Sequence, residues 1–539
     1  MSNMYPSVST RLAETYPICH AFLTGDGWDA IVGGCSAAEA AQDFIDSLEA
    51  HTEGLGLPAY LPELARLELM KAEVAHHTMP AAVFRRAINP TLNLFEASWK
   101  GLSEIIGAKG SPAAVSPEKG REIVIVWRSP TDSTVQTRGA TDEELLVLKI
   151  VAEELNGDEV AESAGIPVGT IDWAFDRAID NGLILNPPSL IRRNAADYTN
   201  ACIEDEAFLS SPFFTVQWHI TQACDLHCRH CYDRSSRSPL QFDEALRVLD
   251  DIRSFCRERH VLGQISFSGG NPFLYPRFFD LYQAAAERGF VTAILGNPVP
   301  RDAIERMLAL QRPAFYQVSL EGLEEHNDYM RGQGHFGRVV QFLDMLREYD
   351  IQSQVMLTLT GDNRDQVISL ADVLRDRADL FTFNRLARVG EAVTLSLPTH
   401  REYKDFVDDY LEAAQHNPVM GLKDNLINIV LHERGMEPFG GCAGYGCSAA
   451  FNFVALLPDG EVHACRKFPS LIGNIHTEGM AEIYDSPAAH RYRAGSEACR
   501  ACPIRPVCGG CLAVMHGEGL NIFEARDPHC FMDLQALGG

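Results

Sequence analysis

The sequence contains no long uninterrupted apolar run, and its first residues lack the features of an export signal. No stretch reaches the roughly 18 apolar residues that a membrane-spanning helix needs. The N-terminus, MSNMYPSVSTRLAETYPICHAF, has neither the basic segment nor the apolar core of a signal peptide. We therefore expect a protein that is neither inserted in a membrane nor exported, and that stays in the cytoplasm.

Positive charge is also scarce, with 46 Lys and Arg residues against 73 Asp and Glu residues and a net charge of −27. Nucleic acids and anionic membrane surfaces are bound through clustered Lys and Arg side chains. We therefore expect neither a nucleic acid nor a membrane among the partners of this chain. The sequence shows no internal repeat and no low-complexity tract, which argues against a solenoid.

Cysteine, in contrast, is abundant, and its 15 residues are unevenly distributed. The larger part falls within residues 224–231 and 442–530. In a reducing cytoplasm, such groups of thiols predict metal or iron–sulfur ligands rather than disulfides. The remaining cysteines are scattered, and we interpret them as ordinary buried thiols: Cys19, Cys35, Cys202 and Cys256.

The front of the chain predicts two small units and a linker. Residues 1–112 look helical, because apolar residues recur every three or four positions, as in LPAYLPELARLELMKAEVAHH. Residues 113–192 predict a hairpin, three helices and a closing strand, which is the order of a winged helix. Between residues 141 and 190, eleven Asp or Glu against two basic residues weigh against DNA and favour a peptide ligand. Residues 193–212 are expected to form a linker.

From residue 213 the pattern changes to alternating strands and amphipathic helices. Repeated strand–helix units of this length indicate an α/β fold in which parallel strands form a partial, six-stranded barrel over residues 213–415. Folds of this kind place their chemistry at the carboxyl ends of the strands. Cys224 begins the loop that follows the first strand. The strand candidates are FFTVQWHI (213–220), QISFSG, VTAILGN, FYQVSLEG, QVMLTLT and LFTFNRL.

That loop, TQACDLHCRHCYDR, carries three cysteines in the spacing Cys224-x3-Cys228-x2-Cys231. An odd number of thiols does not suit a disulfide set, and three are too few to close a tetrahedral zinc site. Thiolates on a loop after a buried strand suit an iron–sulfur cluster. Three ligands on a four-iron cluster leave one iron free to bind a substrate or cosubstrate. Zinc remains the alternative.

With Tyr232 directly after the third cysteine, the loop resembles the cluster-binding motif of the radical S-adenosylmethionine (SAM) enzymes. FSGGNP, ILGNP, VSLEG and MRGQGHFG resemble further strand-end motifs of that superfamily. Two positions depart from those motifs: Asn271 stands where Glu is usual, and Glu321 where Asp is usual. The resemblance implies a [4Fe–4S] cluster that binds SAM, with SAM contacts at Tyr232, Gly269, Gly270, Asn271, Asn297, Ser319, Arg331, Asn363 and Arg385.

The second cysteine group lies in a Gly-rich tail at residues 416–539, which resembles the SPASM extension of radical SAM enzymes. That extension carries two auxiliary [4Fe–4S] clusters. With four ligands each, neither would have an open iron, so electron transfer is the expected role, and structural zinc is the alternative. By the resemblance, one cluster is held by Cys442, Cys447, Cys465 and Cys511, and the other by Cys499, Cys502, Cys508 and Cys530.

Residues 20–185 resemble the partner proteins that present precursor peptides to multinuclear iron oxidases, and the leader-recognition elements of ribosomal peptide pathways. The segment WHITQACDLHCRHCYDRS is similar to that of maturases of the selenobiotic or thio(seleno)oxazole type. These resemblances imply a radical SAM/SPASM enzyme that takes a hydrogen atom from a precursor peptide. A reductase, flavodoxin or ferredoxin would supply the electrons.

Two alternatives remain open from the sequence. One is a protein-directed maturase of the anaerobic sulfatase-maturating type, although the long front of the chain weighs against it. The other is a redox sensor that binds DNA, combining a winged helix with an iron–sulfur cluster. The acidic balance of the winged-helix segment weighs against this second alternative.

Overall fold

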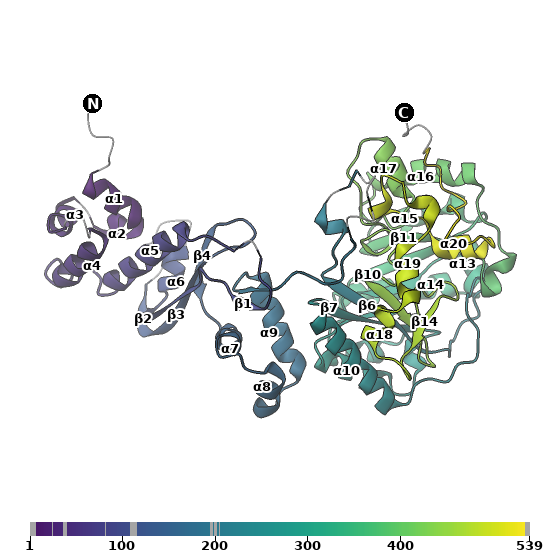
Figure 1. Ribbon diagram of the computed structural model, residues 1–539, viewed down its shortest axis with the longest axis horizontal. Helices are drawn as coiled ribbons and strands as arrows, with labels where there is room; N and C mark the ends of the chain where they lie inside the picture. The colour runs from purple at the N-terminus through teal and green to yellow at the C-terminus, as the bar shows by residue number, and fades with distance from the viewer. Residues whose placement is uncertain are drawn as a thin grey trace. The chain divides into compact units, whose positions relative to one another are not determined.

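The chain divides into two compact units, Unit 1 (residues 1–188) and Unit 2 (residues 189–539) (Figure 1). The described residues form one large buried core in Unit 2 and two smaller ones in Unit 1. The described residues include no helix whose length and apolar character would let it cross a membrane. The structure is a computed structural model, and it describes residues 7–23, 25–35, 40–80, 82–107, 116–194, 198, 202–203 and 205–533.

Unit 1 consists of helices on both sides of a small sheet. The helices before and beside the sheet are α1 (Val8–Thr15), α2 (Pro17–Phe22), α3 (Gly25–Val32), α4 (Ala40–His51), α5 (Leu61–His76) and α6 (Leu102–Gly107). The strands are β1 (Ala87–Ile88), β2 (Asn93–Lys100), β3 (Glu118–Arg128), β4 (Val135–Gly139) and β5 (Ile184–Leu185). The last helices are α7 (Asp142–Ala152), α8 (Gly157–Ala164) and α9 (Val168–Asp180).

Strand β3 joins the two halves of Unit 1, because its alternate side chains enter two different cores. Val124 and Val126 pack with the preceding helices, whereas Ile125 and Trp127 pack with α7, α8 and α9. β3 pairs with β2 on one side and with β4 on the other, both antiparallel. The predicted hairpin is therefore present as β3–β4. The expected division at residues 112 and 113 lies outside the described residues, and the sheet spans it.

Two features of Unit 1 differ from the sequence prediction. Residues 93–100 form strand β2, although helix was expected throughout residues 1–112. In NLFEASWK, Phe95, Ala97 and Trp99 alternate with exposed residues, and this period of two is that of a half-buried strand. The closing strand of the winged helix, β5, pairs with β1 rather than with the β3–β4 hairpin.

Unit 2 is built on a nine-stranded sheet in the order β11-β10-β9-β8-β7-β6-β12-β13-β14. Its strands are β6 (Phe213–Thr221), β7 (Leu262–Gly269), β8 (Val291–Leu295), β9 (Tyr316–Ser319), β10 (Ser353–Leu359), β11 (Leu380–Arg385), β12 (Phe453–Leu456), β13 (Glu461–His463) and β14 (Leu471–Asn474). Its helices are α10 (Phe242–Glu258), α11 (Phe278–Glu287), α12 (Arg301–Leu310), α13 (Glu324–Arg331), α14 (His335–Glu348), α15 (Val367–Leu374), α16 (His400–Ala414), α17 (Ile427–Glu433), α18 (Met480–Tyr484), α19 (Pro487–Ala494) and α20 (Leu512–Gly517).

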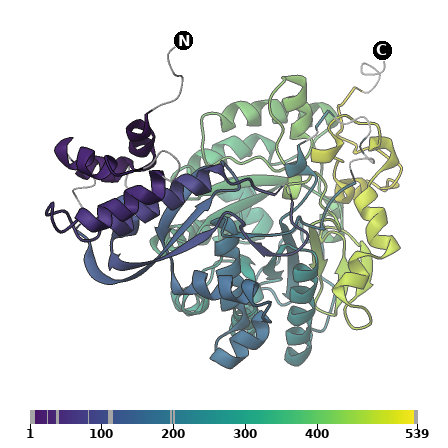
Figure 2. The same ribbon diagram turned by 60° about the vertical axis from the view of Figure 1, so that its left-hand side comes forward.

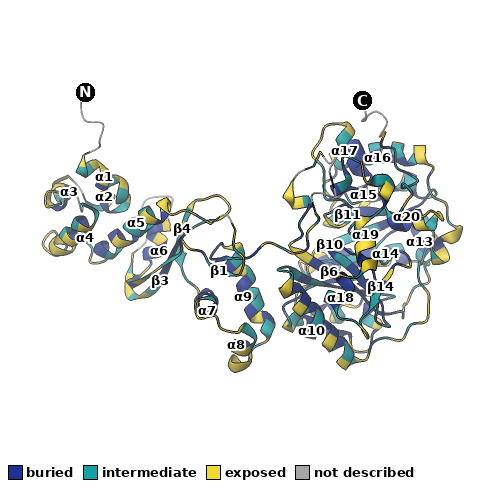
Figure 3. Cartoon of the chain, in the orientation of Figure 1, coloured by how far each residue is buried: buried dark blue, intermediate teal, exposed yellow. Residues whose placement is uncertain are grey.

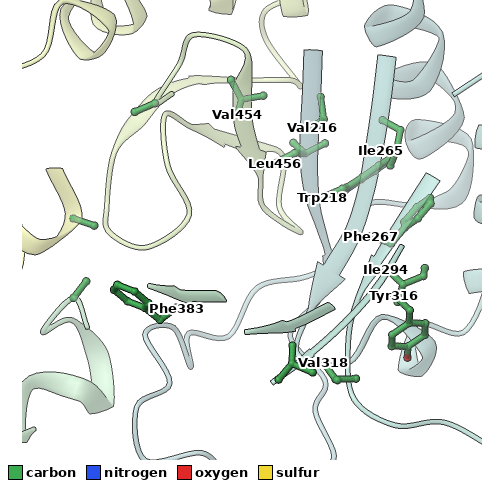
Figure 4. Packing of buried hydrophobic residues seen from close by; sticks show 14 of the residues in the cluster. Val216, Trp218, Ile265, Phe267, Ile294, Tyr316, Val318, Phe383, Val454 and Leu456 are labelled. Atoms are coloured by element: carbon green, nitrogen blue, oxygen red, sulfur yellow. The ribbon is translucent and has the colours of Figure 1, made fainter. Parts of the chain in front are cut away.

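The six strands predicted for the partial barrel are all present, and each pairs in parallel with the next. Their alternate residues, among them Val216, Trp218, Ile265 and Phe267, form a buried apolar layer (Figure 4). Buried residues are concentrated in these strands and on the helix faces that cover them (Figure 3). The α/β partial barrel is therefore confirmed.

The cysteine-rich tail of Unit 2 is continuous with the barrel sheet. Strand β12 pairs in parallel with β6, with Val454 opposite Val216, and both lie in one apolar core. The C-terminal segment, yellow in Figure 2, lies along one side of Unit 2. The expected division between residues 213–415 and 416–539 therefore does not separate two independent cores. Of the expected linker, residues 193–212, the described part belongs to Unit 2.

Candidate functional site

The carboxyl ends of the parallel strands surround a cavity of about 540 Å³, here called the strand-end cavity. This location follows from the topology, because the carboxyl ends of parallel strands meet at one edge of the sheet. Side chains of each barrel strand or of the loop after it line the cavity, and so do residues of the C-terminal tail. The candidate residues that line it are Tyr232, Gly269, Gly270, Asn297, Ser319, Arg331 and Arg385, with Cys224, Cys228, Cys231, Cys442, Cys447, Cys465 and Cys511.

The three cysteines of the loop after β6 line one part of this cavity. Cys224 is exposed, and Cys228 and Cys231 are partly buried. The Cys224 sulfur accepts hydrogen bonds from the Leu226 N–H at 3.4 Å and the Asn297 amide at 3.7 Å. The Cys228 sulfur accepts one from the Arg331 guanidinium at 3.8 Å. Donors of this kind stabilise thiolates, the form in which cysteine binds a metal or cluster.

Burial and neighbouring charges act in opposite directions on these thiols. Burial raises the pKa of Cys224 and of Cys228 above the usual range. The Leu226 N–H opposes the shift at Cys224, and the charge of Arg331 opposes it at Cys228. The thiols also raise one another's pKa, as closely spaced groups of like charge do. A bound metal centre would relieve this repulsion.

The glycine pair after β7 allows the backbone to press against the cysteine loop. Gly269 has φ +133°, and a Cβ at Gly270 would lie 2.2 Å from the Ala223 carbonyl oxygen and 2.8 Å from the Cys224 Cβ. The Gly270 N–H donates to the Thr221 carbonyl at 2.9 Å. Glycine is therefore required here by the approach of the loop itself, a reason separate from the SAM contact expected of both residues.

Asn271 and Asn297 both hold Asp225, a residue that the sequence did not single out. The Asn271 amide donates to the Asp225 carboxylate at 3.0 Å, and its oxygen accepts from the Phe273 N–H at 3.2 Å. The Asn297 amide donates to the same carboxylate oxygen at 2.6 Å. Asn297 lines the cavity, but Asn271 is buried and does not. Asn271 therefore fixes the cysteine loop, and its contact with SAM stays a prediction.

Glu321, the second departure from the family motif, holds Arg331 in the cavity. Its carboxylate accepts two hydrogen bonds from Arg331, at 2.6 and 2.9 Å, and one from the Thr358 N–H at 2.8 Å. Burial acts to raise the pKa of Glu321, but His230 and Arg331 outweigh it and hold that pKa well below its usual range. An ionised glutamate thus substitutes for the usual aspartate, with Arg331 directed toward Cys228.

Two further predicted SAM contacts have other partners. Asn363 is fully buried and does not line the cavity; its side chain bonds the Thr360 N–H and the Glu321 and Thr358 carbonyls. Arg385 borders the cavity, but its guanidinium is bound by Asp424 at 2.8 Å and by Asp527 at 2.7 Å twice. Both side chains therefore bond other protein groups at the strand ends, and their contacts with SAM stay predictions.

Tyr232 lies between the cysteine loop and the tail. Its hydroxyl is 3.2 Å from the His219 Nε2, and the Arg466 guanidinium lies 5.0 Å from its ring centre. Burial raises the pKa of Tyr232 to about 12. His230, Gln217 and Arg466 line the same cavity and were not identified from the sequence. The only available signal was their proximity in sequence to a cysteine or to the first strand.

The tail cysteines fall into the two groups of four that the resemblance to the SPASM extension implied. Burial, with a further contribution from the neighbouring thiols, raises the pKa of Cys447 to about 12 and of Cys465 to about 11. The second group surrounds a separate small hollow lined by Leu426, Ile429 and Met532. The groups are Cys442, Cys447, Cys465 and Cys511 around the strand-end cavity, and Cys499, Cys502, Cys508 and Cys530 around the small hollow.

The arrangement of these donors fits iron–sulfur clusters. Among the described residues, no group of three Cys, His, Asp or Glu side chains is placed to hold a single metal ion. The thiols instead stand around hollows, and a four-iron cluster takes its thiolates at separate corners. The three loop cysteines could hold one cluster, and each tail group of four could hold another.

The four scattered cysteines were expected to be buried. Cys19 and Cys256 are buried, Cys35 is partly buried, and Cys202 is exposed. The Cys202 sulfur lies 4.0 Å from the His432 Nδ1. The expectation was therefore wrong for Cys202, which lies in the loop that enters Unit 2 rather than in a core.

The chain is similar in sequence to two known proteins. It is 22% identical over 390 residues to the antilisterial bacteriocin subtilosin biosynthesis protein AlbA of Bacillus subtilis (strain 168), covering 69% of this chain and 81% of AlbA. It is 24% identical over 351 residues to the AdoMet-dependent heme synthase of Methanosarcina barkeri (strain Fusaro / DSM 804), covering 58% of this chain and 95% of that protein.

Among solved structures, Streptococcus suis SuiB bound to precursor peptide SuiA matches with a TM-score of 0.49 and 18% identity, over 76% of this chain and 96% of that chain. Residues 218–374 match the Radical SAM superfamily model, and residues 447–503 match SPASM, an iron–sulfur cluster-binding domain. The matched residues include the cysteine loop, the glycine pair and part of the tail group. The chain therefore carries a radical SAM domain followed by a SPASM domain.

Proposed function

We propose that this chain is a radical SAM enzyme that modifies a ribosomally made precursor peptide. The observation that carries the proposal is the strand-end cavity, where three thiols of the loop and four of the tail border one space. When bound, a reduced [4Fe–4S] cluster supplies the electron that splits SAM into methionine and a 5′-deoxyadenosyl radical, which removes a hydrogen atom from the substrate. The similarity to AlbA supports a peptide substrate.

The residues of the cavity hold and orient the reactants. Cys224, Cys228 and Cys231 would hold the cluster, and Arg331, fixed by Glu321, offers donors to the carboxylate of SAM together with Ser319. Abstraction of a hydrogen atom requires no general acid or base from the protein. The protein residues therefore position SAM and the substrate and exclude water from the cavity.

The two tail groups would hold auxiliary clusters that carry electrons. Each group has four thiols, so a four-iron cluster there would have no open iron. We propose a reductase, flavodoxin or ferredoxin as the electron donor. Thiolate ligands in these numbers suit a reducing cytoplasm, and we propose that location.

Unit 1 would bind the leader of the precursor peptide. Its last three helices carry an acidic surface that includes the first turn of α7, with Asp142 and Glu143. A surface of this sign favours a leader with Lys or Arg residues and disfavours DNA.

The experiment that tests the proposal is anaerobic reconstitution followed by product analysis. Three four-iron clusters predict about twelve iron atoms per chain, and dithionite with SAM should yield 5′-deoxyadenosine. Removing residues 1–188 should preserve SAM cleavage and reduce modification of a peptide encoded beside the gene. Absence of 5′-deoxyadenosine from the full chain would reject the proposal, and full peptide modification without Unit 1 would reject its leader-binding role.

A further inference from the structure

Arg466 is a cation of the strand-end cavity whose charge has no matching acid. It donates to the Ser268 hydroxyl at 3.3 Å, and its guanidinium lies over the Tyr232 ring. No Asp or Glu oxygen of the described residues lies within 4.0 Å of it. Most of its five N–H donors therefore remain available to a ligand. In a chain of net charge −27, an unmatched arginine in a cavity indicates an anionic ligand.

The neighbouring Lys467 has a different environment. Burial lowers its pKa, but the thiols of Cys511, Cys442 and Cys465 outweigh that effect and raise it. Lys467 therefore compensates the charge of the tail thiols. Arg466 instead acts on the barrel side of the cavity, where burial and then the Arg466 charge lower the pKa of His219 to about 3.

Gln217 provides a second unused donor in the same cavity. Only 4% of its surface is exposed, and its side-chain nitrogen has no hydrogen-bond partner among the described residues. It precedes His219 by two residues on β6, and it is in register with Ser266, two residues before Ser268 on β7. Residues two apart on a strand share a face, so Gln217 lies on the side to which Arg466 is bound. A buried amide nitrogen without a partner destabilises the fold unless a ligand accepts its hydrogen bond.

We propose that Arg466 and Gln217 form a subsite for an acidic side chain, Asp or Glu, of the substrate peptide near the residue that reacts. The Arg466 fork would bind the carboxylate, and Gln217 would donate to the same group or to the adjoining carbonyl. This inference rests on the proposed function as a peptide-modifying enzyme. The carboxylate of SAM is the competing source of the same chemistry, so the test separates the two.

The test measures peptide preference and SAM affinity in parallel. The full-length reconstituted protein with saturating SAM is dialysed without oxygen against two capped hexapeptide libraries that differ only in one fixed residue, Asp or Asn. Bound peptide is quantified by mass spectrometry. We expect the Asp library to bind at least about ten-fold more tightly, as a charge-assisted hydrogen bond provides. Arg466→Gln should reduce the ratio to about one, and Arg466→Lys should give an intermediate ratio because it lacks the fork.

Lys467→Gln is the matched control, because it removes one positive charge from the adjacent residue. It should keep the Asp preference and change the reduction potential of the auxiliary cluster instead. Equal binding of the two libraries, or binding of neither, would overturn the inference. So would a ten-fold loss of SAM affinity in Arg466→Gln with the Asp preference intact. Failure of the proposed function is distinguishable, because the unsubstituted protein would then form no 5′-deoxyadenosine.

Discussion

The strand-end cavity and the small hollow are both lined by cysteines of Unit 2, yet their other walls differ. The cavity has about 540 Å³ of space and is bordered by three loop thiols, four tail thiols and polar side chains such as Gln217 and Arg466. The hollow is bordered by four thiols, by apolar side chains such as Leu426, Ile429 and Met532, and by Arg526 and Asp527. The walls of the cavity offer unused donors to an additional ligand, whereas the walls of the hollow are mostly thiols and apolar side chains.

This difference indicates how one chain can hold chemically distinct clusters. A cluster with four protein thiolates in an apolar hollow has all its irons occupied and serves electron transfer. A cluster with three thiolates beside unused donors can accept a further ligand. The residues around each group of cysteines therefore indicate the role of the cluster as much as the number of cysteines does.

The largest expected effect comes from removing either the loop thiols of the strand-end cavity or the four thiols of the small hollow. Changing Cys224, Cys228 and Cys231 to Ala should remove about four of twelve irons and abolish 5′-deoxyadenosine formation. Changing Cys499, Cys502, Cys508 and Cys530 to Ala should remove a similar amount of iron but leave measurable SAM cleavage with dithionite. Iron analysis and chromatography of the nucleoside measure both. Loss of SAM cleavage to the same degree in both variants would contradict the different roles assigned to the two groups of cysteines.

A smaller effect, on stability, is expected from changing the ion pair that lies between the strand-end cavity and the small hollow. Arg385 borders the cavity, Asp527 borders the hollow, and the two form a buried ion pair. Asp527→Asn should cost about 3–5 kcal/mol, because it leaves a buried charge incompletely compensated. Native-state hydrogen exchange of strand β11 measures the loss. The exposed pair of Arg434 and Asp408 is the control, and Arg434→Ala should cost no more than about 1 kcal/mol. Equal losses in the two variants would contradict a structural role for Arg385.

The smallest expected effect concerns Asp176 of Unit 1, a partly buried acid whose negative charge is not fully compensated by its neighbours. Burial and the neighbouring Asp172 and Asp180 raise the pKa of Asp176 to about 6, despite Arg86. An acid whose folded pKa is raised destabilises the fold as pH rises, so Asp176→Asn should stabilise Unit 1 by about 1–2 kcal/mol at pH near 7.5. The gain should shrink as pH falls from 6 toward 3.8. Urea unfolding followed by tryptophan fluorescence measures it, and a pH-independent gain would contradict the assigned cause.

Much of Unit 2 could be predicted from the sequence, because its signals are local. Strand–helix alternation identified the six barrel strands, and the resemblance to the SPASM extension gave both groups of four cysteines. The strand pairing of Unit 1 was harder to predict from the sequence. β5 pairs with β1 across almost a hundred residues, and nothing in either two-residue strand indicates its partner.

Three of the predicted SAM contacts have side chains that already bond other groups of the protein. Asn271, Asn363 and Arg385 occupy the sequence positions of family contacts, but their hydrogen-bonding groups are taken by Asp225, by backbone at the strand ends, and by Asp424 with Asp527. Long-range partners of this kind leave no trace in the local motif. Conversely, Arg466 and Gln217 were overlooked because a free donor becomes evident only when its surroundings are known.

The most direct test of the central claim is the electron paramagnetic resonance spectrum of the reduced, reconstituted protein during titration with SAM. An open iron in the cluster of the loop cysteines predicts that SAM changes the spectrum of that cluster. The change should be absent when Cys224, Cys228 and Cys231 are replaced and present when the four cysteines of the small hollow are replaced. A spectrum that does not change when SAM is added to the unsubstituted protein would contradict the account.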